Sequence, residues 1–351
     1  MKLFDEEMVM IKNLLKKTEL YVGAIILLIA IIIELRSKSF FMVNNIVNIL
    51  NASVVPGLFT ISTFMIILSG GMDISFPAVA ALTSYVTVDV LNSMNYDGPV
   101  VLIFIIAAIL GALCGAVNAF FIAKMKLPPL IVTLGTQSVF RGILQGALNA
   151  SQINMLPQSM NDFGKSSVYV AINPKTGTSS HLPTGFLIMV TILIISYIIL
   201  NKTLFGRGIY AIGGDAVSAE RAGFNVVRIR FFLYIFSGIV AGLTGIIRSS
   251  MNQMVHPTNL FGIEMTIIAG VILGGVSLIG GRGSLTGAML GMYLITMVEN
   301  SLLLLGIPAY WQTFFVGAVI IIGISATSYR SIVASRKPRT LRGDVLEVEH
   351  E

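Results

Sequence analysis

Long apolar runs, separated by short clusters of charged, Pro, Asn and Gly residues, make up most of this chain. Lipid offers the backbone no hydrogen-bond partner, so apolar runs of this length are predicted to be helices that cross a membrane. The pattern predicts an all-α, polytopic membrane protein with a single transmembrane domain over residues 1–351. About ten spans are expected: Tyr21–Leu35, Ile46–Ser69, Ser75–Leu91, Val100–Ala123, Leu127–Asn149, Thr184–Leu200, Phe231–Ile247, Gly262–Ile279, Ser284–Leu305 and Ala309–Ala326.

The few charged residues indicate which side of the membrane each loop occupies. They make up 11% of the chain, against about 25% in soluble domains. This shortage excludes an ordinary soluble enzyme and a nucleic-acid-binding domain. If the N-terminus lies in the cytoplasm and the spans alternate, most Lys and Arg residues fall inside, and the outer loops hold Arg36, Lys38, Lys165 and Lys175. By the positive-inside rule, both termini are therefore predicted to be cytoplasmic, including residues 1–19 and the tail 330–351.

Two connecting segments are too long to be simple turns: residues 151–183, expected outside, and residues 201–230, expected inside. In the inner segment Asp215 is a good helix N-cap, and Gly223 suits the left-handed position after a helix end. The sequence therefore predicts a helix over Ala216–Ala222. A helix of about two turns is too short to be stable alone in water. It must pack on its own membrane domain or in a groove of another protein, and the spacing leaves both open.

The inner segment resembles the coupling loop of ABC-importer permeases of the simple-sugar type, the group of ribose, xylose and autoinducer-2 permeases. The matching residues are Gly206, Arg207, Tyr210, Ala211, Gly213, Ala219 and Gly223. Asp215 stands where Asn is usual, and Phe224 stands for Ile. Residues 70–75, 128–136 and 273–284 resemble three further family motifs in the same order, although Phe76-Pro77-Ala78 replaces the usual V-G-S.

The resemblance implies an import system in the bacterial plasma (inner) membrane for a small neutral sugar or sugar-like solute. Two permease subunits, either two copies of this chain or this chain and a homologous permease, would form the pore. An ABC ATPase would use the ATP, an extracytoplasmic solute-binding protein would deliver the solute, and the chain itself would hold no cofactor. The residues implied to couple to the ATPase are Gly214, Asp215, Ala219, Glu220, Arg221, Ala222 and Gly223. Related permeases carry branched-chain amino acids or nucleosides, but the Gly-rich signature and the coupling-loop form favour sugars.

Polar residues inside the apolar runs are candidates for a translocation path. Thr133, Gln137, Arg141 and Gln145 recur every four residues, so they share one helix face. An Arg at membrane depth costs about 2.5–3.5 kcal/mol. This face is therefore expected to border a water-filled path, or Arg141 to pair with Asp89 or Glu299; alternatively, Arg141 lies near the outer end and extends to the interface. Asn51 and Asn118 are assigned either to the path, as sugar contacts, or to interhelical hydrogen bonds, and Glu299 is assigned to the path.

The glycines and the remaining ionisable residues complete the prediction. Gly283, Gly287 and Gly291 have the spacing of closely packed membrane helices, and the spacing recurs at 111/115, 142/146, 238/242 and 270/274. The three His residues show no metal-ligand spacing, and no catalytic constellation is readable, so neither a metal site nor an enzyme is expected. An ion-coupled secondary transporter stays open as an alternative, with Asp73, Asp89 and Glu299 as the acids it would need.

Overall fold

The computed structural model describes residues 18–173, 177–322 and 325. The predicted cytoplasmic tail 330–351, and residues 1–17 of the predicted N-terminal segment, lie outside this part of the chain. Four described helices are long and apolar enough to cross a membrane: α2 (Thr18–Ser37), α6 (Val100–Ala119) with the π-helical turn Phe120–Lys124, α9 (Gly185–Lys202) and α12 (Val226–Asn252). Helices α3 (Val43–Ala52) and α4 (Val54–Leu68), bent by 46° at their junction, provide a fifth if they form one broken span.

About ten spans are expected from the sequence. In the described part of the chain, only four or five helices are long and apolar enough to cross a membrane. The other predicted spans contain helices outside this set: α5 (Phe76–Ser93), α7 (Pro129–Gly142), α13 (Glu264–Leu273), α14 (Leu285–Leu304) and the apolar helix Gln312–Ile322. The run Gly262–Ile279 shows why the boundaries differ. Its helix stops at Leu273, and the apolar residues after Gly274 form a partly buried, Gly-rich loop, so apolarity continues where helix does not.

The predicted outer segment 151–183 is folded, and it corrects the all-α expectation. It contains α8 (Gln158–Lys165) and an antiparallel hairpin of β1 (Ser167–Ile172) and β2 (Ser179–Pro183). The first strand is rich in β-branched and aromatic residues, which favour a strand. Asn44 of α3 holds the hairpin, because its side-chain amide donates to the carbonyls of Ala171 (2.9 Å) and Thr178 (3.1 Å).

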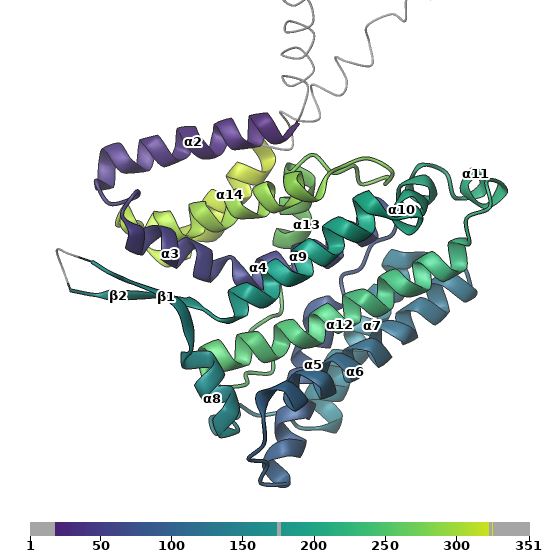
Figure 1. Cartoon of the computed structure of the whole chain (residues 1–351), viewed down its shortest axis with the longest axis horizontal. Helices are drawn as coiled ribbons and strands as arrows, with labels where there is room; N and C mark the ends of the chain where they lie inside the picture. Colours follow the sequence, from purple (N-terminus) through teal and green to yellow (C-terminus); the bar gives the residue numbers. More distant parts are fainter. Residues whose placement is uncertain (1–17, 174–176, 323–324, 326–351) are drawn as a thin grey trace, which may run out of the picture.

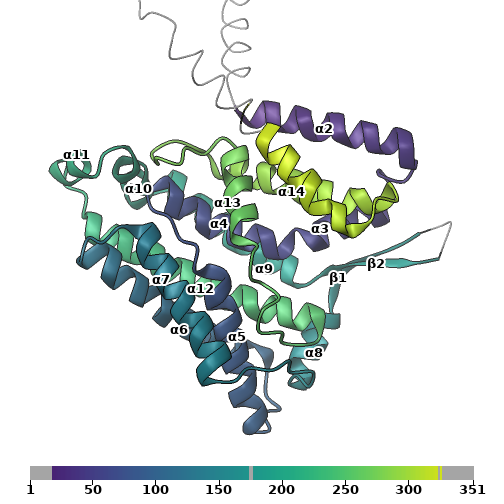
Figure 2. The same ribbon diagram turned by 180° about the vertical axis from the view of Figure 1, so that it is seen from behind.

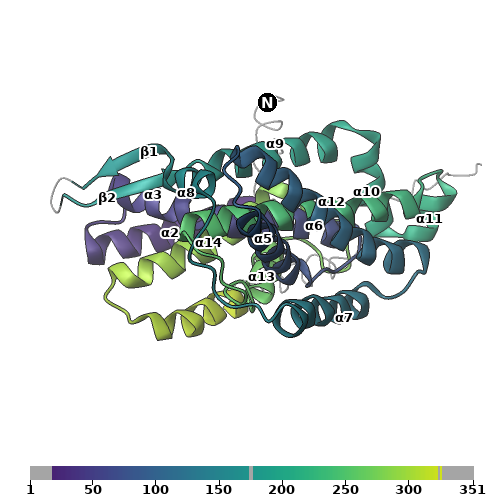
Figure 3. The ribbon, with the colours of Figure 1, turned by 90° about the horizontal axis from the view of Figure 1, so that it is seen from below.

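Two groups of helices surround a buried centre (Figure 1). Helix α4 is buried over nearly its whole length and contacts α9, α12, α13 and α14. On one side of it lie α2, α3, α13 and α14; on the other lie α5, α6, α7 and α12, as Figure 2 also shows from behind. The β1–β2 hairpin and α11 (Ala216–Arg221) lie at opposite ends of the molecule (Figure 3). We call these the hairpin end and the α11 end.

Glycines create the closest helix contacts. Gly111 and Gly115 of α6 lie against Gly238 and Gly242 of α12, and the predicted Gly287 and Gly291 of α14 lie against Gly270 and Gly274 of α13. The prediction is wrong for Gly283, which precedes α14 in a loop at φ +145° beside Val276. It is also wrong for Gly142 and Gly146 within this chain, since a Cβ at either position would meet nothing within 4 Å.

We expect Gly287→Leu to destabilise the protein by about 2 kcal/mol, because a side chain at 287 overlaps the Gly274 carbonyl and forces α13 and α14 apart. Thermal unfolding of the detergent-purified protein measures the change. Gly142→Leu is the matched control, since its glycine lies on α7 facing open space. Equal melting temperatures for the two variants would contradict the role of Gly287 in this contact.

Candidate functional site

Residues 201–230, expected to be a loop with one short helix, are nearly all helical. Helix α9 ends at Lys202, and α10 (Leu204–Gly214), α11 and α12 follow in close succession. Each of these three begins at an N-cap whose side-chain oxygen accepts a hydrogen bond from the backbone N–H three residues later: Thr203 for α10 (3.0 Å), Asp215 for α11 (2.6 Å) and Asn225 for α12 (2.8 Å). Such caps satisfy N–H groups that have no partner within the helix. The three capping side chains therefore divide the segment into separate helices.

Helix α11 begins at the predicted cap and ends at Arg221 rather than Ala222. The Ser218 N–H stabilises the charged form of Asp215, which lowers the pKa of that carboxyl. At the other end Gly223 has φ +92°, the Phe224 N–H donates to the Ala219 carbonyl (3.1 Å), and the Gly223 N–H donates to the Glu220 carbonyl (3.0 Å). This pair of bonds is a Schellman motif. It fixes the end of a helix that is too short to persist without it.

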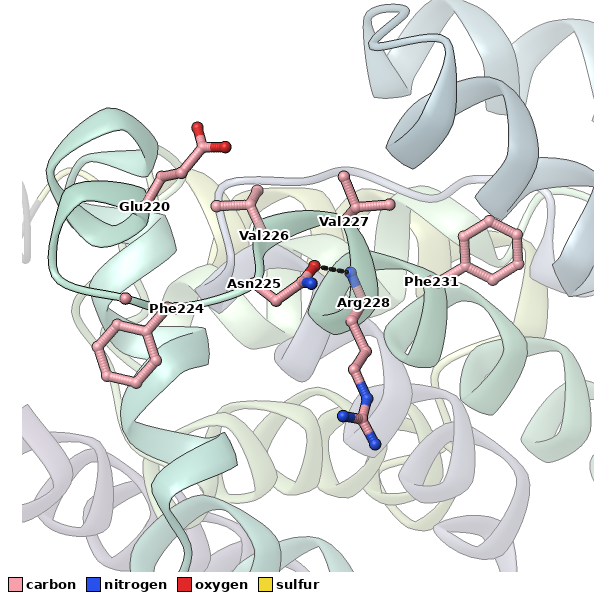
Figure 4. A pocket seen from close by; sticks show the side chains of 8 residues that line it. Glu220, Phe224, Asn225, Val226, Val227, Arg228 and Phe231 are labelled. Atoms are coloured by element: carbon pink, nitrogen blue, oxygen red, sulfur yellow. Dashed lines mark hydrogen bonds between the residues drawn. The ribbon is translucent and has the colours of Figure 1, made fainter.

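Only Ala219 of α11 is buried; Glu220 and Arg221 are exposed. A groove of about 710 Å³ runs beside the helix, along the first turns of α12 (Figure 4). Its lining is mainly apolar, and Glu220 and Arg228 point to opposite sides of it (Figure 4). The lining residues are Glu220, Gly223, Phe224, Asn225, Val226, Val227, Arg228 and Phe231. An exposed short helix beside an apolar groove is a surface suited to protein docking.

Helix α10 ties α11 to the buried centre of the molecule. A Cβ at Gly213 would overlap the Leu68 carbonyl at the end of α4, and Gly281 donates its backbone N–H to that same carbonyl (2.8 Å). The backbone of Gly280 lies against Gly70. We call Gly70, Gly213, Gly280 and Gly281 the glycine junction. Three motifs that are far apart in sequence, 70–75, 206–224 and 273–284, meet here. The helix that precedes α11 therefore has direct backbone contacts with the end of α4 and with the loop that leads into α14.

Apart from the glycine junction, a cluster of polar side chains links α7 to α13. Gln137 and Arg141 both donate to Glu264 Oε1, the latter from Nη2 at 2.6 Å, and the Arg141 guanidinium lies 4.1 Å from the centre of the Phe261 ring. Arg141 and Glu264 form the one ion pair of the described residues. The expected partners, Asp89 and Glu299, are therefore wrong. Sequence reasoning missed Glu264 because it begins a short helix 123 residues from Arg141, and no local pattern connects the two.

The other predicted path residues lie apart from this cluster. Gln145 is exposed on the π-helical turn Ile143–Ala147, whose longer period takes it off the α7 face. Asn118 is buried between helices, donating to Ser75 Oγ (2.8 Å) and accepting from Thr136 Oγ1 (2.7 Å). Thr133 is also buried, with its hydroxyl 3.4 Å from the Met72 carbonyl. These contacts fit the interhelical hydrogen bonding that the sequence left open for Asn118.

Asn51 and Glu299 lie in two further places. Asn51 Nδ2 donates to the His181 carbonyl (2.9 Å) and so holds β2 against α3. Glu299 of α14 lines a small pocket of about 120 Å³ with Thr266 and Thr296. Of the seven predicted path residues, the structure joins only Gln137 and Arg141 in one cluster, and it adds Glu264 to them.

Comparison with known proteins assigns the family. Residues 45–324 match the family described as the permease component of the branched-chain amino acid transport system. The ribose import permease protein RbsC of Haemophilus influenzae is 31% identical over 306 residues, covering 87% of this chain and 91% of that protein. RbsC of Escherichia coli strain K12 is 32% identical over 304 residues, or 86% and 90% of the two chains.

A second group of relatives is represented by the autoinducer 2 import system permease protein LsrC of Yersinia enterocolitica. It is 30% identical over 284 residues, covering 81% of this chain and 75% of that protein. No solved structure shows a significant match. The family match and these relatives each cover most of the described helices. The chain therefore belongs to the family of branched-chain amino acid transport system permease components, and within it resembles the ribose and autoinducer-2 import permeases.

Proposed function

We propose that this chain is the permease subunit of an ABC importer that passes a small neutral sugar or sugar-like solute across a bacterial inner membrane. The observation that carries the proposal is α11, an exposed and doubly capped helix that directly follows α10, whose backbone contacts α4 at the glycine junction. An exposed helix of this kind can dock on a partner protein that supplies the energy for transport. The relatives named for ribose and autoinducer-2 import supply the solute class.

The partner at the α11 end is an ABC ATPase, which hydrolyses the ATP. Glu220 and Arg221 project from α11, and the residues from Gly214 to Gly223 form the docking segment. The groove beside them adds a second contact. Its apolar lining, between Glu220 and Arg228, suits an apolar side chain of the ATPase flanked by a basic and an acidic group. Docking at two points lets the ATPase pull α11 as well as push it.

In this proposal the α11 end lies in the cytoplasm and the hairpin end lies outside, where a solute-binding protein delivers the solute. Both termini are cytoplasmic, and the shorter apolar helices complete about ten membrane crossings. The Lys and Arg distribution supports this orientation. A second permease, identical or homologous, covers exposed apolar side chains of α7 and α13, such as Ile131 and Met265. If the two permeases enclose the solute path between them, polar side chains are expected close to this contact surface.

The cluster of Gln137, Arg141 and Glu264 borders that path. The Arg141 side chain is 32% exposed and its partner Glu264 only 8%, so the guanidinium faces the open side of the cluster. Because the two charges neutralise each other, the lining offers hydrogen bonds without a net charge. Such a lining suits a neutral, hydroxyl-rich solute, which must be bound weakly enough to be released.

The test is reconstitution of the permease with its ATPase and binding protein in proteoliposomes. Uptake of radiolabelled pentose should require ATP and all three components. The double reversal Glu220→Arg with Arg221→Glu should leave membrane insertion unchanged and reduce uptake by at least about 10-fold, because it inverts the charges that meet the ATPase. Wild-type uptake in this variant would remove α11 from the coupling role.

Uptake measurements in the same proteoliposomes distinguish the sugar importer from two alternative functions. An ion-coupled transporter would take up solute in a proton or sodium gradient without ATP. A branched-chain amino acid permease, which the family description names, would carry leucine and not pentose. The sugar-permease relatives and the neutral α7–α13 cluster favour the sugar importer over both.

A further inference from the structure

The hairpin end carries a polar pocket of about 520 Å³ that no part of the proposed transport path uses. Four elements form it: α3, the end of α8, β2 and the last turn of α12. These elements meet at the hairpin end of the molecule in Figure 1. The polar side chains that line it are those of Asn51, Lys165, Ser166, His181, Arg248, Asn252 and Gln253. We call it the outer pocket.

The charge of the outer pocket is unbalanced. Lys165 and Arg248, two cations from distant parts of the chain, line it together with His181, and none of its lining residues is an acid. Neither Lys165 nor Arg248 forms an ion pair with any described residue. Arg248 is half-buried, and its Nε is buried without a hydrogen-bond partner among the residues that the structure describes. Gathering two cations costs free energy unless an anion joins them.

The walls of the outer pocket are fixed before any ligand arrives. The end of α8 lies directly on α12. The two backbones are so close there that a Cβ at Gly164 would overlap the Ser250 carbonyl. β2 is tied to α3 by the bond from Asn51 to the His181 carbonyl (2.9 Å). The hydroxyls of Ser166 and Thr184 lie 2.7 Å apart and join the two ends of the hairpin segment. A preformed pocket loses little entropy when a ligand enters it.

We propose that the outer pocket binds an Asp or Glu side chain of the solute-binding protein when that protein docks on the permease. This inference rests on the proposed function, since it assumes a binding protein on the hairpin side. A carboxylate forms strong, charge-assisted hydrogen bonds with Arg and Lys, and the amides of Asn252 and Gln253 add neutral donors. A neutral sugar would leave both cations uncompensated, so the pocket suits the partner's acid better than the transported solute.

The position of the cations supports a specific role. The positive-inside rule leaves few Lys and Arg residues on the outer side of this chain, yet Lys165 and Arg248 share one pocket. Docking here also connects the binding protein to α12, which begins beside the groove at the α11 end and runs to the outer pocket at its other end. One helix thus touches both proposed docking surfaces.

The test measures the affinity of the purified binding protein for the permease–ATPase complex in nanodiscs of neutral lipid. Lys165→Glu and Arg248→Glu should each weaken binding by about 30-fold or more, and higher salt should weaken wild-type binding. Replacing the responsible acid of the binding protein with Lys should restore binding to Lys165→Glu. Arg36→Glu is the matched control: it makes the same change of charge at an exposed residue near the hairpin end but outside the pocket.

Lys165 is exposed at the end of α8, so its reversal tests the proposal even if Arg248→Glu fails to fold. Unchanged affinity in folded Lys165→Glu would overturn the proposal. The proposal would also be overturned if the variants lost affinity for the binding protein only in nanodiscs of anionic lipid. The pocket would then act through a bound lipid headgroup and not through an acid of the binding protein. If the wild-type complex takes up pentose with its binding protein but the variants bind normally, only the outer-pocket inference fails. If the wild type shows no ATP-driven uptake, the proposed function fails with it.

Discussion

Replacing Gly213 with valine should abolish ATP-driven uptake and destabilise the protein by about 3 kcal/mol or more. A Cβ at 213 overlaps the Leu68 carbonyl and closely approaches the Gly281 N–H, which are themselves hydrogen-bonded to each other. All of these are backbone atoms, so no side-chain rotation relieves the overlap. The end of α10 must move away from α4, and α11 then loses its mechanical connection to the buried centre. Thermal unfolding and uptake in proteoliposomes measure the two effects.

The adjacent glycine provides the control for stability. A Cβ at Gly214 meets nothing within 4 Å, so Gly214→Ala should melt within about 1 °C of the wild type. The ATPase activity of the complex adds a second readout. If Gly213→Val still binds the ATPase but no longer couples hydrolysis to uptake, the junction transmits motion rather than merely stabilising the fold. Normal uptake by Gly213→Val would show that α10 moves independently of α4.

The coupling segment shows which features sequence alone can predict. The limits of α11 depend on Asp215 and Gly223, which act on residues within one helical turn, so local reasoning found them. Helix α10 was not predicted because its glycines lower helix propensity. It forms because Ile209 and Ile212 are buried against the rest of the protein. Stability supplied by such tertiary contacts leaves little trace in the local pattern.

The glycine motifs illustrate a second limit. Residues 70–75, 206–224 and 273–284 could each be recognised as family motifs, but nothing in their sequence says that they touch. Their convergence follows from the path of the chain through α4, α10 and the loop before α14. The hairpin was missed for a different reason, since its short apolar strand lies in a polar segment that gave no helical or membrane signal.

Arg141 shows how far the physics of one residue can lead. Its charge within an apolar run required a partner or access to water, and the structure provides a partner in Glu264, while the Arg141 side chain itself is one-third exposed. Sequence could establish that need because it follows from the cost of the charge. It could not identify Glu264, because that choice depends on the packing of α7 beside the start of α13.

This ion pair gives an asymmetric prediction. Arg141→Met should destabilise the protein by about 3 kcal/mol, near the lower end for a broken buried pair, because it leaves the Glu264 carboxylate buried with only Gln137 as a donor. Glu264→Gln should cost only about 1 kcal/mol, since the more exposed guanidinium of Arg141 reaches water. Combining the two changes should restore stability relative to Arg141→Met alone. Denaturant unfolding of the four proteins forms a double-mutant cycle that measures this coupling.

Uptake by the same four proteins separates a structural from a transport role for the pair. Arg36→Met, which removes an exposed cation that forms no ion pair with any described residue, controls for the loss of charge. If the pair only holds α7 against α13, uptake should recover in the double variant together with stability. If it borders the solute path, uptake should stay low after stability returns, because Met offers no hydrogen bond to a sugar hydroxyl. A double variant less stable than Arg141→Met would show that Glu264 is held by something other than this arginine.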